Sequence, residues 1–123
     1  MTGPQILIAE DEGLLRNLIA DRLTELGLHV MQAADGIQAT KILKENAGIS
    51  VLLSDIRMPR MGGYDLVEAA LAYNPELKIL MMTGDAGDQP PPAALKAREI
   101  RTLFKPFNMD DMCSKVFDML GRA

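Results

Sequence analysis

Short runs of consecutive apolar residues alternate along the chain with stretches in which apolar residues recur every three or four positions. Such runs are typical of strands that are buried on both faces, and the spaced stretches are typical of helices with one buried face. The runs predict five strands, at Gln5–Ala9, Leu28–Ala33, Ile49–Ser54, Leu77–Met82 and Ile100–Phe104.

The spaced stretches predict a helix after each strand, at Leu15–Leu26, Ala39–Leu43 with a stop near Gly48, Tyr64–Tyr73, Ala93–Glu99 and Met109–Leu120. In the first helix Leu18 and Leu26 fall on the predicted apolar stripe, and Gly27 can end it. Asp35 and Asn108 can cap the second and fifth helices with a side-chain oxygen. The fourth helix should be short, because prolines and glycines precede it.

Five rounds of strand and helix predict an α/β protein. With right-handed crossovers, the strands form a doubly wound parallel sheet that has helices on both faces. The length of 123 residues suits one domain over residues 1–123. In such sheets the functional crevice lies beyond the carboxyl ends of the strands, so those ends are the place to look for chemistry.

Composition narrows the functional classes. The net charge of −4 and the pI near 4.9 argue against a nucleic-acid partner, which needs a basic face. No apolar run approaches the roughly 20 residues that cross a bilayer, and the N-terminus lacks a signal-peptide pattern. We therefore expect a cytoplasmic protein without a membrane partner. The single cysteine, Cys113, excludes an internal disulfide and falls on an apolar helical stripe, which predicts a core position.

Polar residues that can bind a metal ion or take part in a reaction follow four of the predicted strands. The run Glu10–Glu12 follows the first strand, Asp55 the third, Thr83 the fourth and Lys105 the fifth. Carboxylates brought together at one edge of a sheet cannot all stay ionised cheaply without a counter-charge. Mg²⁺ binds oxygen ligands and typically uses one or two carboxylates. The pattern therefore predicts a magnesium site, although each residue alone also has a structural explanation as a cap, a strand end or a surface charge.

These residues resemble the receiver domain of bacterial two-component response regulators over essentially the whole chain. The resemblance is carried by the pair Glu10–Asp11, by Asp55, by Thr83 and by the pair Lys105–Pro106. The stretch Asp55–Gly63 also resembles the loop that follows the acceptor aspartate of that family. The resemblance implies a flavodoxin-like sheet with strand order 2-1-3-4-5, and a cis bond between Lys105 and Pro106.

The resemblance also implies a metal site. Asp11 and Asp55 would ligate Mg²⁺ directly, and Glu10 would act nearby, often through a metal-bound water. The backbone carbonyl of Arg57 would be a further ligand.

The resemblance implies a phosphorelay function in which the chain is not a classical enzyme and promotes only its own phosphorylation and dephosphorylation. Asp55 would accept a phosphoryl group from a sensor histidine kinase or a histidine phosphotransfer protein. The Thr83 hydroxyl would donate to that group, and Lys105 would pair with it. A downstream protein would then bind the face made by the fourth helix, the fifth strand and the fifth helix.

One position departs from the family pattern. Receivers usually carry an aromatic switch residue three positions before the lysine, and this chain has Thr102 there, with Phe104 two residues later. We therefore expect the signal to travel through different side chains.

The sequence leaves two alternative functions open and disfavours two others. The chain can be a receiver cut from a larger regulator or hybrid kinase, or a receiver-like interaction module that is not phosphorylated. A flavin or nucleotide binder would need a glycine- or hydroxyl-rich phosphate loop after the first strand, where this chain has acids that repel phosphate. An aspartate-based phosphatase would need a second acid two residues after the nucleophile, where this chain has Arg57.

Overall fold

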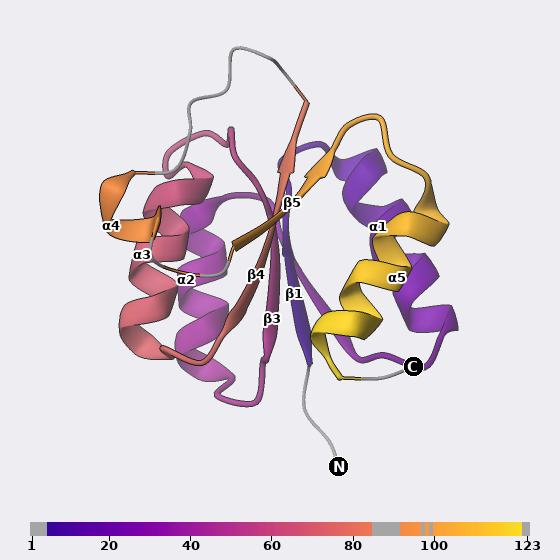
Figure 1. Cartoon of the computed structure of the whole chain (residues 1–123), viewed down its shortest axis with the longest axis horizontal. Coiled ribbons are helices and arrows are strands. Elements are labelled where there is room, and N and C mark those ends of the chain that lie inside the picture. The colour runs from indigo at the N-terminus through magenta and orange to yellow at the C-terminus, as the bar shows by residue number, and fades with distance from the viewer. Residues whose placement is uncertain (1–4, 85–91, 97, 99, 122–123) are drawn as a thin grey trace.

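The computed structural model describes residues 5–84, 92–96, 98 and 100–121. A central parallel sheet lies between two layers of helices (Figure 1). In chain order the elements are β1 (Ile6–Ala9), α1 (Gly13–Glu25), β2 (Val30–Ala33), α2 (Gly36–Glu45), β3 (Val51–Asp55), α3 (Gly63–Tyr73), β4 (Lys78–Thr83), α4 (Ala93–Lys96), β5 (Ile100–Phe104) and α5 (Met109–Met119).

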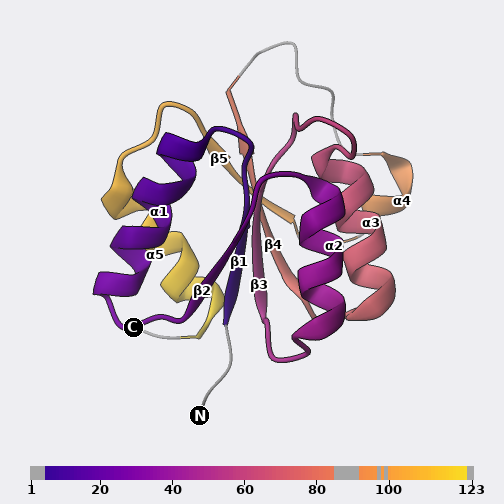
Figure 2. The ribbon, with the colours of Figure 1, turned by 180° about the vertical axis from the view of Figure 1, so that it is seen from behind.

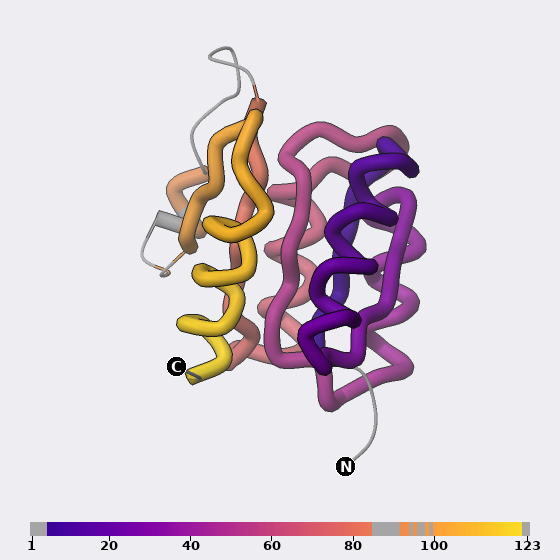
Figure 3. The backbone as a smooth tube through the Cα atoms, turned by 90° about the vertical axis from the view of Figure 1, so that its right-hand side faces the viewer, coloured from indigo at the N-terminus to yellow at the C-terminus, as the bar shows by residue number. Residues whose placement is uncertain are grey.

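The sheet has the order β2-β1-β3-β4-β5, and every pairing is parallel. The expected α/β class and the 2-1-3-4-5 order are therefore confirmed. Helices α1 and α5 cover one face, and α2, α3 and α4 cover the other, as the views from the front and from behind show (Figures 1 and 2). Figure 3 shows α1 and α5 side by side. An ion pair of 2.8 Å between Arg22 and Asp110 joins them.

Alternate residues of each strand supply two separate cores, which is why the strands read as continuous apolar runs. In β1, Ile6 and Ile8 pack under α1 and α5, whereas Leu7 and Ala9 pack under α2 and α3. All four side chains are fully buried. Cys113 is also buried in the first of these cores, which confirms its expected position.

The predicted boundaries hold to within two residues for the strands, and β5 matches its prediction. Both predicted caps are confirmed: Asp35 accepts a hydrogen bond from the Gln38 amide at 2.9 Å, and Asn108 accepts one from the Asp111 amide at 2.7 Å. Gly27 ends α1 with a φ of 92°, a left-handed conformation that favours glycine. Helix α4 is as short as expected, and residues 97 and 99 of its predicted span lie outside the described residues.

Two details of the helices were predicted wrongly. The stripe assigned to α1 included Leu18 and Leu26. Leu18 is 49% exposed, because only a narrower stripe faces the sheet, and Leu26, which is 45% exposed, is the C-cap residue and lies beyond the end of α1. Helix α2 ends at Glu45 rather than near Gly48, with Asn46 as its C-cap residue. In the part of the chain that the structure describes, no helix has the length and apolar character that a bilayer crossing requires.

The start of α3 lies so close to the end of β3 that only glycine fits at position 63. A Cβ atom on Gly63 would lie 2.2 Å from the Asp55 carbonyl oxygen and 2.9 Å from the Ile56 Cα. Because both of these neighbours are backbone, a side chain here would force the site-bearing strand and the helix apart.

We predict that Gly63→Ala lowers the free energy of unfolding by about 1–3 kcal/mol, the range typical of overpacked positions. Urea denaturation followed by circular dichroism measures this change. Gly13→Ala is the matched control. A Cβ there would lie 3.6 Å from Arg16 Nη2, an ordinary van der Waals contact, so this substitution should be neutral or stabilising. Equal stability of the Gly63→Ala variant and the wild type would contradict the packing argument.

Candidate functional site

Three acidic side chains converge at the carboxyl end of the sheet, as expected from the sequence. Each of Glu10, Asp11 and Asp55 offers one carboxylate oxygen, and these oxygens all lie within 4.8 Å of one another. Glu10 follows β1 directly, Asp11 is next to it, and Asp55 is the last residue of β3, which pairs with β1. Glu10 and Asp55 are buried, whereas Asp11 is exposed. The site is thus a cluster of carboxylates that is open to solvent on one side.

Lys105 supplies a positive charge to this cluster. Its Nζ donates a hydrogen bond to Glu10 Oε1 at 3.0 Å and lies 3.5 Å from Asp55 Oδ2. The peptide bond from Lys105 to Pro106 is cis, as the resemblance implied. One ammonium group therefore faces two buried carboxylates, and Asp11 adds a third negative charge.

Burial and mutual repulsion disfavour the ionised forms of the Asp55 and Glu10 carboxylates. Burial raises the pKa of Asp55 above its ordinary value, and the charge of Asp11 adds to this, although Lys105 opposes it. Burial also raises the pKa of Glu10, with a smaller contribution from the charge of Asp55. Burial alone would lower the pKa of Lys105, but its bond to Glu10 and the charge of Asp55 outweigh this, and its pKa is raised. The site therefore favours more positive charge than Lys105 provides.

Backbone and side-chain hydrogen bonds fix the carboxylates in place. The Glu12 amide donates to Glu10 Oε2 at 3.0 Å, and the Ile56 amide donates to Asp55 Oδ1 at 2.9 Å. Arg16 of α1 donates from Nη1 to the Glu10 carbonyl at 2.8 Å. The contact of Arg16 was not predicted from the sequence, although its position one helical turn after the acidic loop indicates such a contact.

Thr83 ends β4 next to the lysine. It is buried, and its carbonyl accepts a hydrogen bond of 2.7 Å from the Lys105 amide. The structure thus brings Thr83 to the same edge of the sheet as the acids, as the sequence predicted.

The loop from β3 to α3 forms one wall of the site. Together with Asp11, the loop residues Ile56–Pro59 and Gly62 line an open depression of about 410 Å³. Arg57 is exposed on this wall. The loop is tied to the start of α2, because Arg60, with a φ of 68°, forms an ion pair with the buried Asp35. This ion pair joins residues 25 positions apart, a separation over which the sequence pattern predicts no contact.

The donor set fits a hard divalent cation. Three carboxylates within 4.8 Å of one another, two of them buried and with raised pKa values, would be stabilised by a bound cation. Mg²⁺ prefers oxygen ligands and usually keeps several of its waters. A site with few protein ligands that is open to solvent on one side therefore suits it. A carboxylate such as that of Asp55 is also chemically able to attack an activated phosphoryl group.

The switch position is polar in the structure as well. Thr102 lies in β5 with an exposed side chain, and Phe104 on the same strand is 72% exposed. Phe104, which precedes Lys105 in the sequence, therefore projects toward solvent at the end of β5 and does not take the place of the aromatic switch residue at position 102.

Comparison with known proteins places these observations in a family. A family model described as the response regulator receiver domain matches residues 6–117. The response regulator receiver protein CpdR of Brucella abortus is 35% identical over 119 residues, which cover 97% of this chain and 98% of the relative. The chemotaxis protein CheY homolog of Campylobacter jejuni is 32% identical over 120 residues, which cover 95% of this chain and 92% of the relative.

A solved structure agrees with this assignment. The receiver domain of the hybrid histidine kinase CckA is similar with a TM-score of 0.80 and 27% identity, over 94% of this chain and 98% of that one. Because the family model and both relatives span nearly the whole chain, the chain belongs to the response regulator receiver domains, the signalling modules of two-component systems.

Proposed function

We propose that this receiver takes a phosphoryl group onto Asp55 from a phosphohistidine and that the modified state changes its affinity for another protein. The observation that carries the proposal is the placement of Asp55. Its carboxylate lies with those of Glu10 and Asp11 within 4.8 Å, and 3.5 Å from the Lys105 ammonium. The donor would be a sensor histidine kinase or a histidine phosphotransfer protein.

The chemical step is a displacement at phosphorus. A carboxylate oxygen of Asp55 forms the new P–O bond, the P–N bond to the donor imidazole breaks, and the imidazole leaves with the bonding electron pair and takes up a proton. Such transfer depends on positioning and on neutralising the charge of the phosphoryl oxygens. Lys105 would contribute one positive charge, and it acts as a point charge because its ammonium group is not bidentate.

Glu10, Asp11, Asp55 and the backbone carbonyl of Arg57 would hold Mg²⁺, with Glu10 acting through a metal-bound water. When bound, the ion supplies further positive charge to the phosphoryl oxygens. The opening lined by Asp11 and the β3–α3 loop lies beside this cluster, and a donor side chain would approach Asp55 from there.

The output of the receiver would depend on Thr83 and on one face of the fold. The Thr83 hydroxyl would donate to a phosphoryl oxygen, and the downstream protein would bind the face made by α4, β5 and α5. Because Thr102 replaces the usual aromatic residue, the change at Thr83 must reach this face through other side chains. The cytoplasmic location and the single-domain organisation expected from the sequence stay predictions. A separate regulator and a receiver within a longer chain would share the same chemistry.

We predict that acetyl phosphate with Mg²⁺ adds one phosphoryl group to the wild-type chain and none to Asp55→Asn, because the amide is not a nucleophile. Intact-mass spectrometry measures the addition. Asp21→Asn, an exposed acid on α1, is the matched control and should label as the wild type does. Wild-type labelling of the Asp55→Asn variant would refute the acceptor assignment, and an unlabelled wild type would favour the interaction module instead.

We also predict that Asp55→Asn raises the melting temperature by a few degrees without Mg²⁺. Since the pKa of Asp55 is raised in the folded state, the folded chain binds that proton more tightly than the unfolded chain. At neutral pH the ionised carboxylate therefore disfavours folding, and a neutral amide removes this cost. Calorimetry at pH 7 measures the shift, and Asp21→Asn should leave the temperature almost unchanged. A lower melting temperature for Asp55→Asn would show that its pairing with Lys105 outweighs burial and repulsion.

A further inference from the structure

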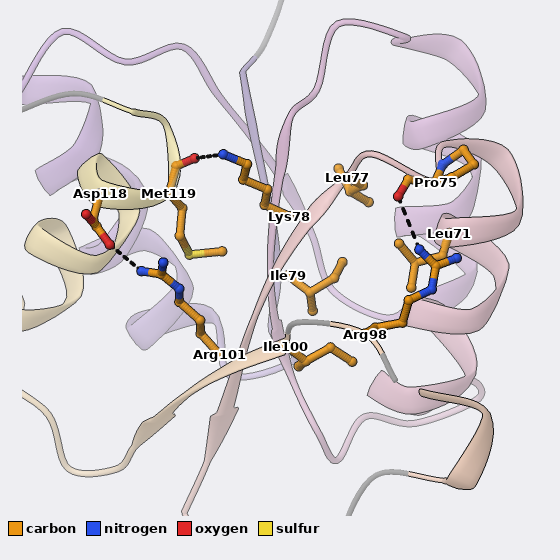
Figure 4. A pocket seen from close by; sticks show the side chains of 10 residues that line it. All are labelled: Leu71, Pro75, Leu77, Lys78, Ile79, Arg98, Ile100, Arg101, Asp118 and Met119. Carbon is orange, nitrogen blue, oxygen red and sulfur yellow. Dashed lines mark hydrogen bonds and ion pairs between the residues drawn. The ribbon is translucent and has the colours of Figure 1, made fainter. Parts of the chain in front are cut away.

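A second concave site lies at the end of the sheet opposite the acidic cluster. It opens across the first residues of β4 and β5, between the C-terminal ends of α3 and α5 (Figure 4). Strand β4 runs from Lys78 at this site to Thr83 at the acidic cluster, a separation of roughly 17 Å at the rise of an extended strand. A molecule bound in this β4–β5 pocket would therefore leave Asp55 accessible.

The inner surface of the β4–β5 pocket is apolar. Leu77, Ile79 and Met119 line it with buried side chains, and Leu71 and Ile100 add to it from α3 and β5. The cavity volume is about 220 Å³, below the roughly 300–1,000 Å³ of sites that enclose a small-molecule ligand or cofactor. This size suits a single bulky side chain that anchors a longer molecule.

The rim of the pocket is positively charged in a chain that is negative as a whole. Its described lining residues include the cations Lys78, Arg98 and Arg101 and one acid, Asp118, a net charge of +2 against −4 for the chain. Asp118 is paired with Arg101. Lys78 donates to the Met119 carbonyl at 2.7 Å and Arg98 to the Pro75 carbonyl at 3.3 Å. Because these acceptors are neutral, the charges of Lys78 and Arg98 are not cancelled by them.

We propose that the β4–β5 pocket is a docking site for an acidic segment of a partner protein, in which one bulky apolar side chain is flanked by carboxylates. The apolar side chain would fill the cavity, and the carboxylates would meet Lys78 and Arg98 at the rim. The site includes Leu71 of α3 and the start of β4, so it extends beyond the face of α4, β5 and α5. The docking is separate from phosphoryl transfer at Asp55.

A structural explanation competes with this proposal. Cations near helix C-termini often stabilise the last carbonyl groups, and Lys78 has that position at the end of α5. If capping is their only role, removing these charges changes stability and no ligand recognises the pocket. A direct binding measurement separates the two explanations.

The probe is the synthetic peptide acetyl-Asp-Asp-Phe-Asp-Asp-amide, titrated into the ¹⁵N-labelled chain and followed by NMR. We expect saturable shifts of the Lys78, Ile79 and Ile100 amides. Two matched peptides, with Asn for every Asp or Ala for Phe, should bind at least tenfold more weakly, because each lacks one half of the complementarity. The proposal fails if no saturable shift occurs, if the shifts map elsewhere, or if all three peptides bind equally.

Variants of the chain complete the test. Lys78→Gln with Arg98→Gln should weaken binding of the acidic peptide at least tenfold, whereas Lys41→Gln with Lys44→Gln, which removes the same charge from α2, should not. Arg98→Gln alone provides the same test, with a smaller loss, if the double variant fails to fold, since Arg98 is exposed. Unchanged binding by the folded variants would overturn the proposal. So would concentration-dependent dimerisation in sedimentation velocity that these variants abolish, because the occupant would then be a second copy of the chain.

Discussion

The constraint on which the site depends is the convergence of three carboxylates, two of which face the Lys105 ammonium group. Parallel pairing of β1 with β3 sets Glu10 and Asp11 beside Asp55, and pairing of β4 with β5 brings Lys105 to the same edge. Two of the acids are buried. The fold therefore concentrates negative charge where solvent screens it least, and a cation relieves this charge more completely than Lys105 can. We propose that this excess of negative charge attracts a metal ion, and that the bound ion in turn attracts an anionic group.

The sheet separates this chemistry from the opposite end of the molecule. Strand ends at one side of the sheet carry the acids, and strand starts at the other side carry the apolar pocket with its basic rim. The central strands β1, β3 and β4, which are buried almost throughout, connect the two ends. The same architecture can thus support a reactive site and a docking site that do not compete for space.

The alternation of strands and helices, the two side-chain caps and the shortness of α4 followed from local patterns, because periodicity and capping are properties of neighbouring residues. The order of the strands within the sheet followed from the family resemblance instead. The strand ends likewise located the acids, Thr83 and Lys105. Periodicity could not predict that Leu18 would be exposed. It indicates which face of a helix is apolar, but not how much of that face the sheet covers. Contacts between distant segments were also missed, such as the ion pair of Arg60 with Asp35. The β4–β5 pocket was missed for the same reason, because its walls come from four elements.

The central claim is that Glu10, Asp11 and Asp55 together bind one magnesium ion. Titration of the ¹⁵N-labelled chain with MgCl₂ at neutral pH tests it most directly, with Asp11→Asn measured in parallel. The account predicts saturable shifts at millimolar concentration for the amides of Asp11, Ile56 and Arg57, and clearly weaker binding by the variant. Amide resonances that stay unmoved around all three acids, or equal affinity of the variant and the wild type, would contradict it.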